Sequence, residues 1–270
     1  MKGKRWRAAL LGLVFSAGMC GAVYGMSEEL ERGQTVEVEE LDLSITFPED
    51  WVCFNSGMAE DDPIFSTYGL DGSTMLEQWE TGGIYIDALD FSMECTVVHN
   101  QKGGITHLTQ YTDEEIQSIM EDLSSSDMME ILDSAEGEQR ELVEQVEEIS
   151  IDYQEIVHKE QAAYMVGDSR MSVGGRILQG RQYYTVVNGN YIAFNFNSLT
   201  EEPLTEEQKL LAASIMNTVE FGHLDPVKME GLRLDWEKIG REVLIGALIG
   251  GAAGVCLWFA GKKKRAKKGE

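Results

Sequence analysis

The side chains of this 270-residue sequence that could carry acid–base or metal chemistry are three of its four histidines. His99 and His107 flank the polar segment NQKGG, and together with His158 they could gather around a metal ion or supply a general base. The sequence favours ordinary surface or loop histidines instead. The motifs G-x-S-x-G, H-E-x-x-H, S-x-x-K and the P-loop do not occur. No catalytic, cofactor-binding or metal-binding residue is therefore predicted.

Cysteine chemistry is the second option, and it concerns Cys53 and Cys95. Outside the cytoplasm the two could form a disulfide, which would close a loop of about forty residues and contribute roughly 4 kcal/mol. A pair of reduced, buried thiols is an equal alternative, because Cys95 alternates with Met93 and Val97 on an apparently buried face. Zinc is disfavoured, since neither cysteine has a second Cys or His at ligand spacing.

Charge is distributed very unevenly along the chain. Between Met26 and Arg241 there are 45 acidic and 12 basic residues, a net charge of −33 within the −25 of the whole sequence. Because a phosphate backbone requires a basic face, this surplus excludes nucleic acid as a partner of the body. Acidic side chains can hold Ca²⁺, but no D-x-D-x-D-G loop occurs, and a solvated acidic surface is the favoured interpretation. A basic or otherwise cationic partner would fit this charge.

Both ends of the chain indicate a membrane protein. Residues 1–25 have a basic start, an apolar middle and small residues near the end, which is typical of a secretory signal peptide. An uncleaved signal anchor remains an alternative; a lipid anchor on Cys20 is disfavoured by Met19 before it. Val243 to Ala260 is an uncharged apolar run of 18 residues followed by the basic tail GKKKRAKKGE. A transmembrane helix over 242–260 with a cytoplasmic tail, 261–270, is predicted.

The resulting topology is a single-pass protein of the cytoplasmic membrane with its body outside and its C-terminus in the cytosol. The basic tail would contact anionic lipid. Three glycines at four-residue spacing, Gly246, Gly250 and Gly254, would line one face of the transmembrane helix and allow a second helix to approach closely. Homodimerisation through this face is one option, and ordinary membrane-helix composition is the other.

The outer body is predicted to be one domain over residues 35–222, preceded by a short segment, 26–34, and followed by a juxtamembrane stalk, 223–241. Alternation from Leu41 to Phe47 predicts a strand, and short strands or extended segments are expected at 51–54, 84–98 and 218–221. Asn188-Gly189 is the favoured pair for a tight hairpin turn between two strands within 183–198. Helices are predicted after Ser73 and after the capping boxes that begin at Thr112 and Thr205.

Three segments, FPEDW at 47–51, YYTVVNGNYIAFNF at 183–196 and SIMNTVEF at 214–221, resemble PsbP-like extracytoplasmic domains of membrane-anchored proteins from Gram-positive bacteria. The resemblance covers roughly 41–221 and implies an α+β fold, an α/β/α sandwich with a mainly antiparallel sheet. It also implies a non-enzymatic binding or accessory module at the cell surface. The matching positions are structural, so no functional residue carries over. A hydrolase acting on the cell envelope through an unrecognised active site is the alternative.

Overall fold

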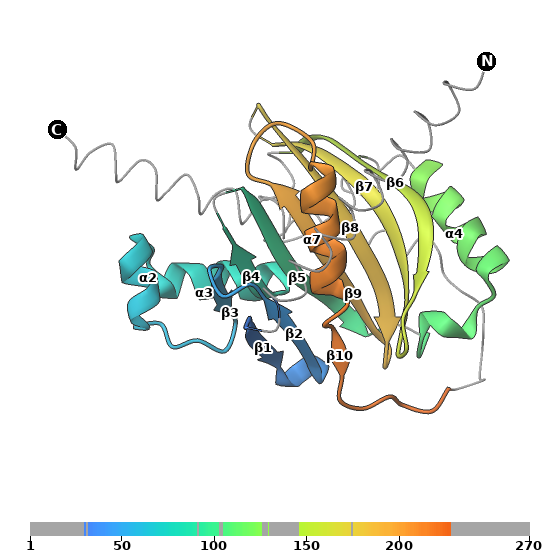
Figure 1. The fold of residues 1–270 in the computed structure, drawn as a ribbon, viewed down its shortest axis with the longest axis horizontal. Helices are drawn as coiled ribbons and strands as arrows, with labels where there is room; N and C mark the ends of the chain where they lie inside the picture. The colour runs from blue at the N-terminus through green and yellow to red at the C-terminus, as the bar shows by residue number, and fades with distance from the viewer. Residues whose placement is uncertain are drawn as a thin grey trace, which may run out of the picture.

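The computed structural model describes residues 30, 32–90, 92–102, 105–125, 129, 146–173 and 175–227 (Figure 1). The predicted signal peptide, most of the stalk, the transmembrane helix with Gly246, Gly250 and Gly254, and the basic tail lie outside these residues. Within the described part of the chain, no helix is both long enough and apolar enough to cross a membrane.

The centre of the domain is an antiparallel sheet of seven strands in the order β3-β4-β5-β9-β8-β7-β6. Strands that are consecutive in the chain pair with one another within β3–β5 and within β6–β9, and β5 pairs with β9 to join the two halves of the sheet. The strands are β3 (Val52–Asn55), β4 (Ile84–Leu89), β5 (Met93–Lys102), β6 (Val146–His158), β7 (Ala163–Val173), β8 (Arg176–Val187) and β9 (Asn190–Ser198).

A second, three-stranded antiparallel sheet has the order β1-β2-β10. It consists of β1 (Gln34–Val38), β2 (Leu43–Phe47) and the short β10 (Glu220–Phe221), and a 3₁₀ helix, η1 (Glu39–Leu41), connects β1 and β2. The strand predicted from Leu41 therefore begins two residues later, because Asp42 adopts a left-handed conformation with φ of 49°. The last strand of the domain thus pairs with one of the first.

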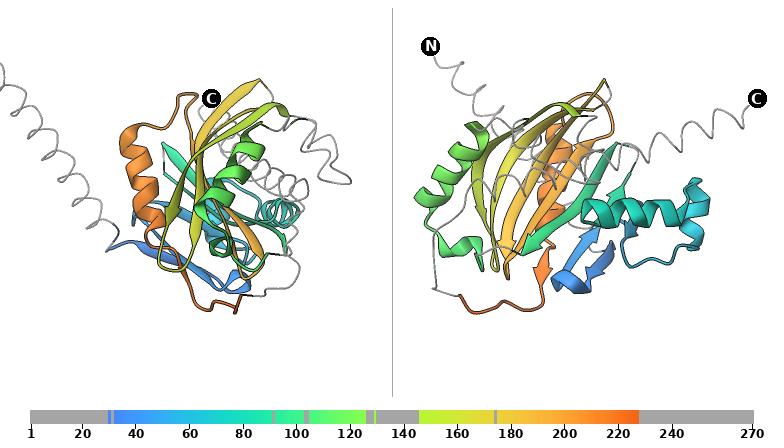
Figure 2. Two further views of the ribbon diagram at one scale, coloured as in Figure 1. Left: turned by 90° about the vertical axis from the view of Figure 1, so that its right-hand side faces the viewer. Right: turned by 180° about the vertical axis from the view of Figure 1, so that it is seen from behind.

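Helices cover both faces of the large sheet (Figure 2). On one face α7 (Glu206–Met216) packs together with the small sheet over a core that includes Phe47, Phe194 and Ile215. On the other face α2 (Pro63–Tyr68), α3 (Gly72–Gly82) and α4 (Asp113–Ser125) enclose a core that includes Trp79 and Ile116. A second 3₁₀ helix, η2 (Leu108–Gln110), precedes α4. The expected mixed α+β fold with antiparallel sheets is confirmed.

Local sequence signals explain several element ends. Thr205 and Gln208 form the predicted capping box, in which each side chain binds the other residue's backbone N–H at 3.2 and 2.9 Å. Asp71 caps α3 by accepting from the backbone N–H of Thr74, so this helix begins one residue before the predicted Ser73. The turn between β8 and β9 is made by Asn188 and Gly189 with φ of 55° and 78°, as the hairpin prediction requires.

Candidate functional site

A row of polar side chains crosses the large sheet on the face covered by α3 and α4. The row consists of residues that are partners on adjacent strands: Asp87 on β4, Thr96 on β5, Asn195 on β9, Gln182 on β8 and, beyond Gly167 on β7, Tyr153 on β6. Apart from Gly167, each of these five residues is at most 6% exposed. We call these five residues the polar row. Buried polar groups at such density require hydrogen-bond partners.

Three hydrogen bonds run along the polar row in one direction. The hydroxyl of Tyr153 donates to Oε1 of Gln182. Nε2 of Gln182 then donates to Oδ1 of Asn195 over 2.8 Å, and Nδ2 of Asn195 donates to Oγ1 of Thr96 over 3.4 Å. Burial raises the pKa of Tyr153 far above its ordinary value, so the phenol keeps the proton that it donates. These bonds form an ordered network that joins β6, β8, β9 and β5 and passes over β7.

Glycine at position 167 allows the first hydrogen bond of this network, between Tyr153 and Gln182, to form. Gly167 stands between Tyr153 and Gln182 in the row, so the tyrosine side chain can pass over β7. A Cβ at this position would lie 2.5 Å from the carbonyl oxygen of Asp152, which is backbone and cannot yield easily. β6 is also irregular here, with a register shift between Tyr153 and Glu155.

Two buried carboxyl groups lie at the other end of the polar row. Asp87 on β4 and Glu94 on β5 occupy diagonal positions of one hairpin on the same face of the sheet, and each is 1% exposed. Burial raises the pKa of Asp87 to about 7, although the hydrogen bond with Glu94 acts in the opposite direction. Burial, and then the charge of Asp87 and its hydrogen bond, raise the pKa of Glu94 well above its ordinary value. We call these two residues the carboxyl pair.

Burial favours the protonated form of both carboxyl groups. Outside the pair, no donor of the described residues reaches Oδ1 or Oδ2 of Asp87 or Oε2 of Glu94. A negative charge in this position is strongly disfavoured, because desolvation of a carboxylate is costly without compensating donors. The hydrogen bond with Glu94 holds the pKa of Asp87 below the value that burial alone would give, and the charge of Asp87 raises the pKa of Glu94, so Asp87 is the first of the two to ionise.

A small cavity of about 20 Å³ lies beside the polar row, between β6, β7, β8 and β9, and is lined by Ile149, Ile151, Ser169, Arg170, Met171, Leu178, Asn195 and Asn197. Nδ2 of Asn197 is buried and has no hydrogen-bond partner among the described residues. This volume suits about one water molecule. The cavity is thus too small for an organic substrate.

The two cysteines lie on the opposite face of the same strands. Cys53 and Cys95 are both partners of Ala88, one on each side of β4, and both are buried free thiols. The disulfide considered from the sequence is not formed, because a whole strand separates the two residues. Burial raises the pKa of Cys53 to about 12, with a smaller effect of the charge of Asp87, and burial is also the main cause of the raised pKa of Cys95. Both are therefore unreactive thiols at neutral pH.

The three histidines do not gather. His107 is buried, with Nε2 2.7 Å from the carbonyl oxygen of Asp225 and Nδ1 accepting from the backbone N–H of Asn188. Because Nδ1 accepts, Nε2 is the nitrogen that carries the proton. His158 is exposed and bonds to Asp113 over 2.9 Å, whereas His99 packs edge-on against Tyr85. Across the described residues no group of three or more His, Cys, Asp or Glu is arranged to hold a metal ion.

An open cavity of about 450 Å³ lies at the N-terminus of α7. It is lined by residues of the β4–β5 turn, the segment after β9 and the first turns of the helix: Asp90, Ser92, Thr200, Glu202, Pro203, Thr205, Glu207, Gln208 and Leu211. Asp90 is occupied in shaping the turn, since its carboxylate accepts from the backbone N–H groups of Ser92 and Met93. The lining therefore offers carboxylates, hydroxyls and an amide, with neither histidine nor cysteine.

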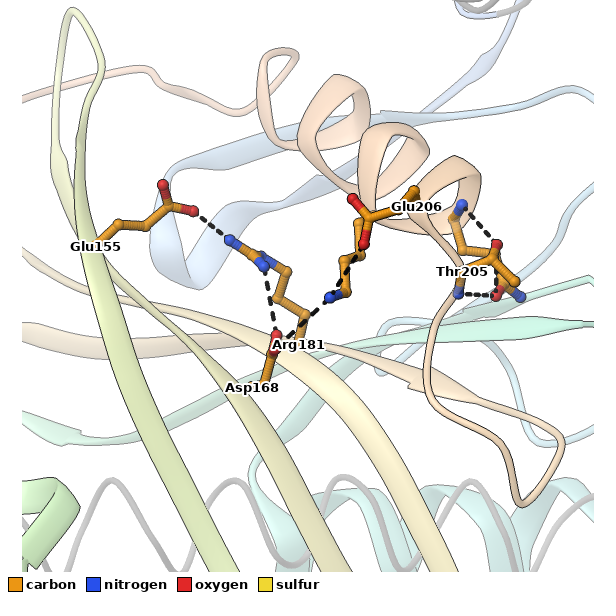
Figure 3. Close-up of polar contacts among 7 residues, drawn as sticks. Glu155, Asp168, Arg181, Thr205 and Glu206 are labelled. Carbon is orange, nitrogen blue, oxygen red and sulfur yellow. Dashed lines mark hydrogen bonds and ion pairs between the residues drawn. The ribbon is translucent and has the colours of Figure 1, made fainter.

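A cluster of ion pairs joins the start of α7 to the large sheet (Figure 3). The guanidinium of Arg181 on β8 pairs with Glu155 on β6 and, over 3.3 Å, with Asp168 on β7. Lys209 on α7 reaches Asp168 over 3.6 Å and Glu206 over 3.5 Å. Only 14% of the Arg181 side chain is exposed. These contacts fix the position of α7 and hence one wall of the open cavity.

Sequence reasoning missed the polar row and the carboxyl pair. The alternation of Asn195 and Asn197 with Phe194 and Phe196 is typical of a strand with one solvated face. In the structure all nine residues of β9 are buried, because elements cover both faces of the sheet. The available signal was the aromatic and β-branched composition around Asn188-Gly189, which is typical of strands in the centre of a sheet.

No family model matches the chain, and the comparison with curated proteins found no match. Among solved structures, the chain is similar to the solution structure of cyanobacterial PsbP (CyanoP) from Synechocystis sp. PCC 6803. The identity is 12% and the TM-score 0.40, and the match covers 70% of this chain and 91% of that one. This likeness is distant and concerns the fold alone. The Gram-positive source expected from the sequence stays a prediction.

Proposed function

We propose that the chain is a single-pass membrane protein whose acidic extracytoplasmic domain is a non-catalytic binding or accessory module at the cell surface. The observation that supports this proposal best is the open cavity at the start of α7. It has the size of a small-ligand or side-chain site, yet neither a histidine nor a cysteine lines it. His99, His107 and His158 are each engaged elsewhere.

Charge indicates what kind of partner the module would bind. The stretch from Gly33 to Gln101, which contains β1 to β4, α2, α3 and most of β5, has no lysine or arginine. Carboxylates of Asp90, Glu202 and Glu207 lie around the open cavity. A basic segment of another protein complements such a surface, and the attraction would increase its rate of association.

Site-specific photocrosslinking in intact cells tests this proposal. A photoreactive residue at Leu211, which lines the cavity, should capture one defined partner, whereas the same residue at the exposed Gln117 on α4 should not. High salt should weaken the capture if the partner is basic. Protease added to intact cells should remove the domain and leave a membrane-bound stub. Full protection of the domain, or turnover of a cell-wall substrate that is lost on replacing His158 by Ala, would contradict the proposal.

A further inference from the structure

We propose that the carboxyl pair, Asp87 and Glu94, is a proton-dependent latch that keeps the β3–β4–β5 end of the large sheet closed while both groups are protonated and loosens it when the pair ionises. The proposal goes beyond the proposed function and does not depend on it. It rests on the burial of the pair within one hairpin, on the lack of donors around it and on the two buried thiols on the opposite face of the same strands.

The pair has no compensating charge. On its own face its neighbours across the strands are Phe54 on β3, Thr96 on β5, and Asn195 and Asn197 on β9, none of which is titratable. The titratable groups of α3, Glu77 and Glu80, are exposed, and they carry negative charge. On the opposite face lie the thiols of Cys53 and Cys95, which are neutral. Among the described residues no lysine, arginine or histidine faces the pair.

Ionisation of Asp87 therefore leaves a buried carboxylate that no cation balances, and ionisation of Glu94 as well would leave two carboxylates that repel one another. This charge is relieved when water enters the hairpin of β4 and β5. The pKa of about 7 for Asp87 places the first ionisation near neutral pH. The hairpin is the part of the sheet best able to open, because β3 is an edge strand of four residues that pairs with β4 alone.

The thiols of Cys53 and Cys95 provide the readout. They are 8% and 0% exposed, and both are partners of Ala88, the residue that follows Asp87. A thiol reagent can reach them only when this end of the sheet opens, so labelling measures the opening directly. Intrinsic thiol reactivity also rises with pH. A comparison with a variant that lacks the latch, at the same pH, removes this effect.

The experiment uses the full chain in detergent or membranes and follows labelling of Cys53 and Cys95 from pH 6 to pH 9, with the modified peptides identified by mass. Asp87→Asn and Glu94→Gln each remove one titratable carboxyl of the pair while preserving shape, and Glu80→Gln on α3 is the matched control. Relative to Asp87→Asn, labelling of the native chain should increase about ten-fold per pH unit above pH 7. Glu80→Gln should behave like the native chain.

If Asp87→Asn does not fold, Glu94→Gln provides a second comparison, because a glutamine amide can donate to an ionised Asp87 and cannot itself ionise. A ratio of labelling rates that stays constant from pH 6 to pH 9 would overturn the proposal. So would a native chain in which both thiols are labelled quickly at pH 6.

Discussion

The hydroxyl of Tyr153 on β6 donates a hydrogen bond to Oε1 of Gln182 on β8, although β7 lies between the two strands. Both side chains are buried. Contacts across a sheet ordinarily join adjacent strands, so this bond depends on the missing side chain of Gly167. It ties the edge strand β6 to the central strands through side chains as well as through the backbone.

Replacing Tyr153 by Phe should destabilise the domain by about 1 to 3 kcal/mol, because Oε1 of Gln182 is then left buried without a donor. The measurement is denaturant unfolding followed by circular dichroism. Tyr68→Phe is the control, since Tyr68 is 40% exposed and its hydroxyl can be solvated. Equal stability of the two variants would contradict the role given to the polar row.

Replacing Gly167 by Ala should cost about 1 to 3 kcal/mol through overpacking. The new methyl group would lie 2.5 Å from the carbonyl oxygen of Asp152 and 2.8 Å from Cα of Tyr153. Gly57→Ala is the matched control, because the nearest atom there is the side-chain Oδ1 of Asn55 at 3.2 Å. The measurement is thermal unfolding of both variants. A loss of stability at position 167 that is no larger than the loss at position 57 would contradict this prediction.

Overall stability should decrease as pH rises from about 4 to about 7, and Asp87 should be a main cause. Its pKa is raised from 3.8 in the unfolded chain to about 7 in the folded one. The folded state therefore holds a proton that the unfolded state releases in this interval, and the proton stabilises the fold most at low pH. The difference corresponds to roughly 4 kcal/mol. Urea unfolding at several pH values should show the decrease in the native chain and a flatter profile in Asp87→Asn.

The sequence predicted best those elements that local chemistry determines. The Asn188-Gly189 turn requires two positive φ angles, and the box of Thr205 and Gln208 satisfies free N–H groups at a helix start, so short motifs identified both. The strands β6 and β7 were not predicted. β6 is rich in glutamate and aspartate, which are uncommon in strands, yet its first residue, Val146, pairs with Val173. This pairing is tertiary and outweighs local propensity.

The polar row could not be predicted for a related reason. Asp87, Glu94 and Asn195 have the types and alternation of a solvated strand face, and only the helices that cover this face make them buried. The cover comes from α3 and α4, which lie far from β9 in the sequence. A periodicity of two shows that a strand has two different faces. It does not show whether a second layer covers the more polar one.

Replacing Arg181 by Met should lower the stability by about 1 kcal/mol at low salt, and less at high salt. Arg181 pairs with Glu155 and Asp168, and only 14% of its side chain is exposed, so its charge is less screened than that of a surface pair. Its removal leaves Lys209 alone to balance Asp168. Arg170→Met is the control, because Arg170 is 3.9 Å from Glu148 and both are about half exposed. Unfolding in urea at two salt concentrations separates the variants. If Arg170→Met costs as much, the cluster at the start of α7 is an ordinary set of surface charges.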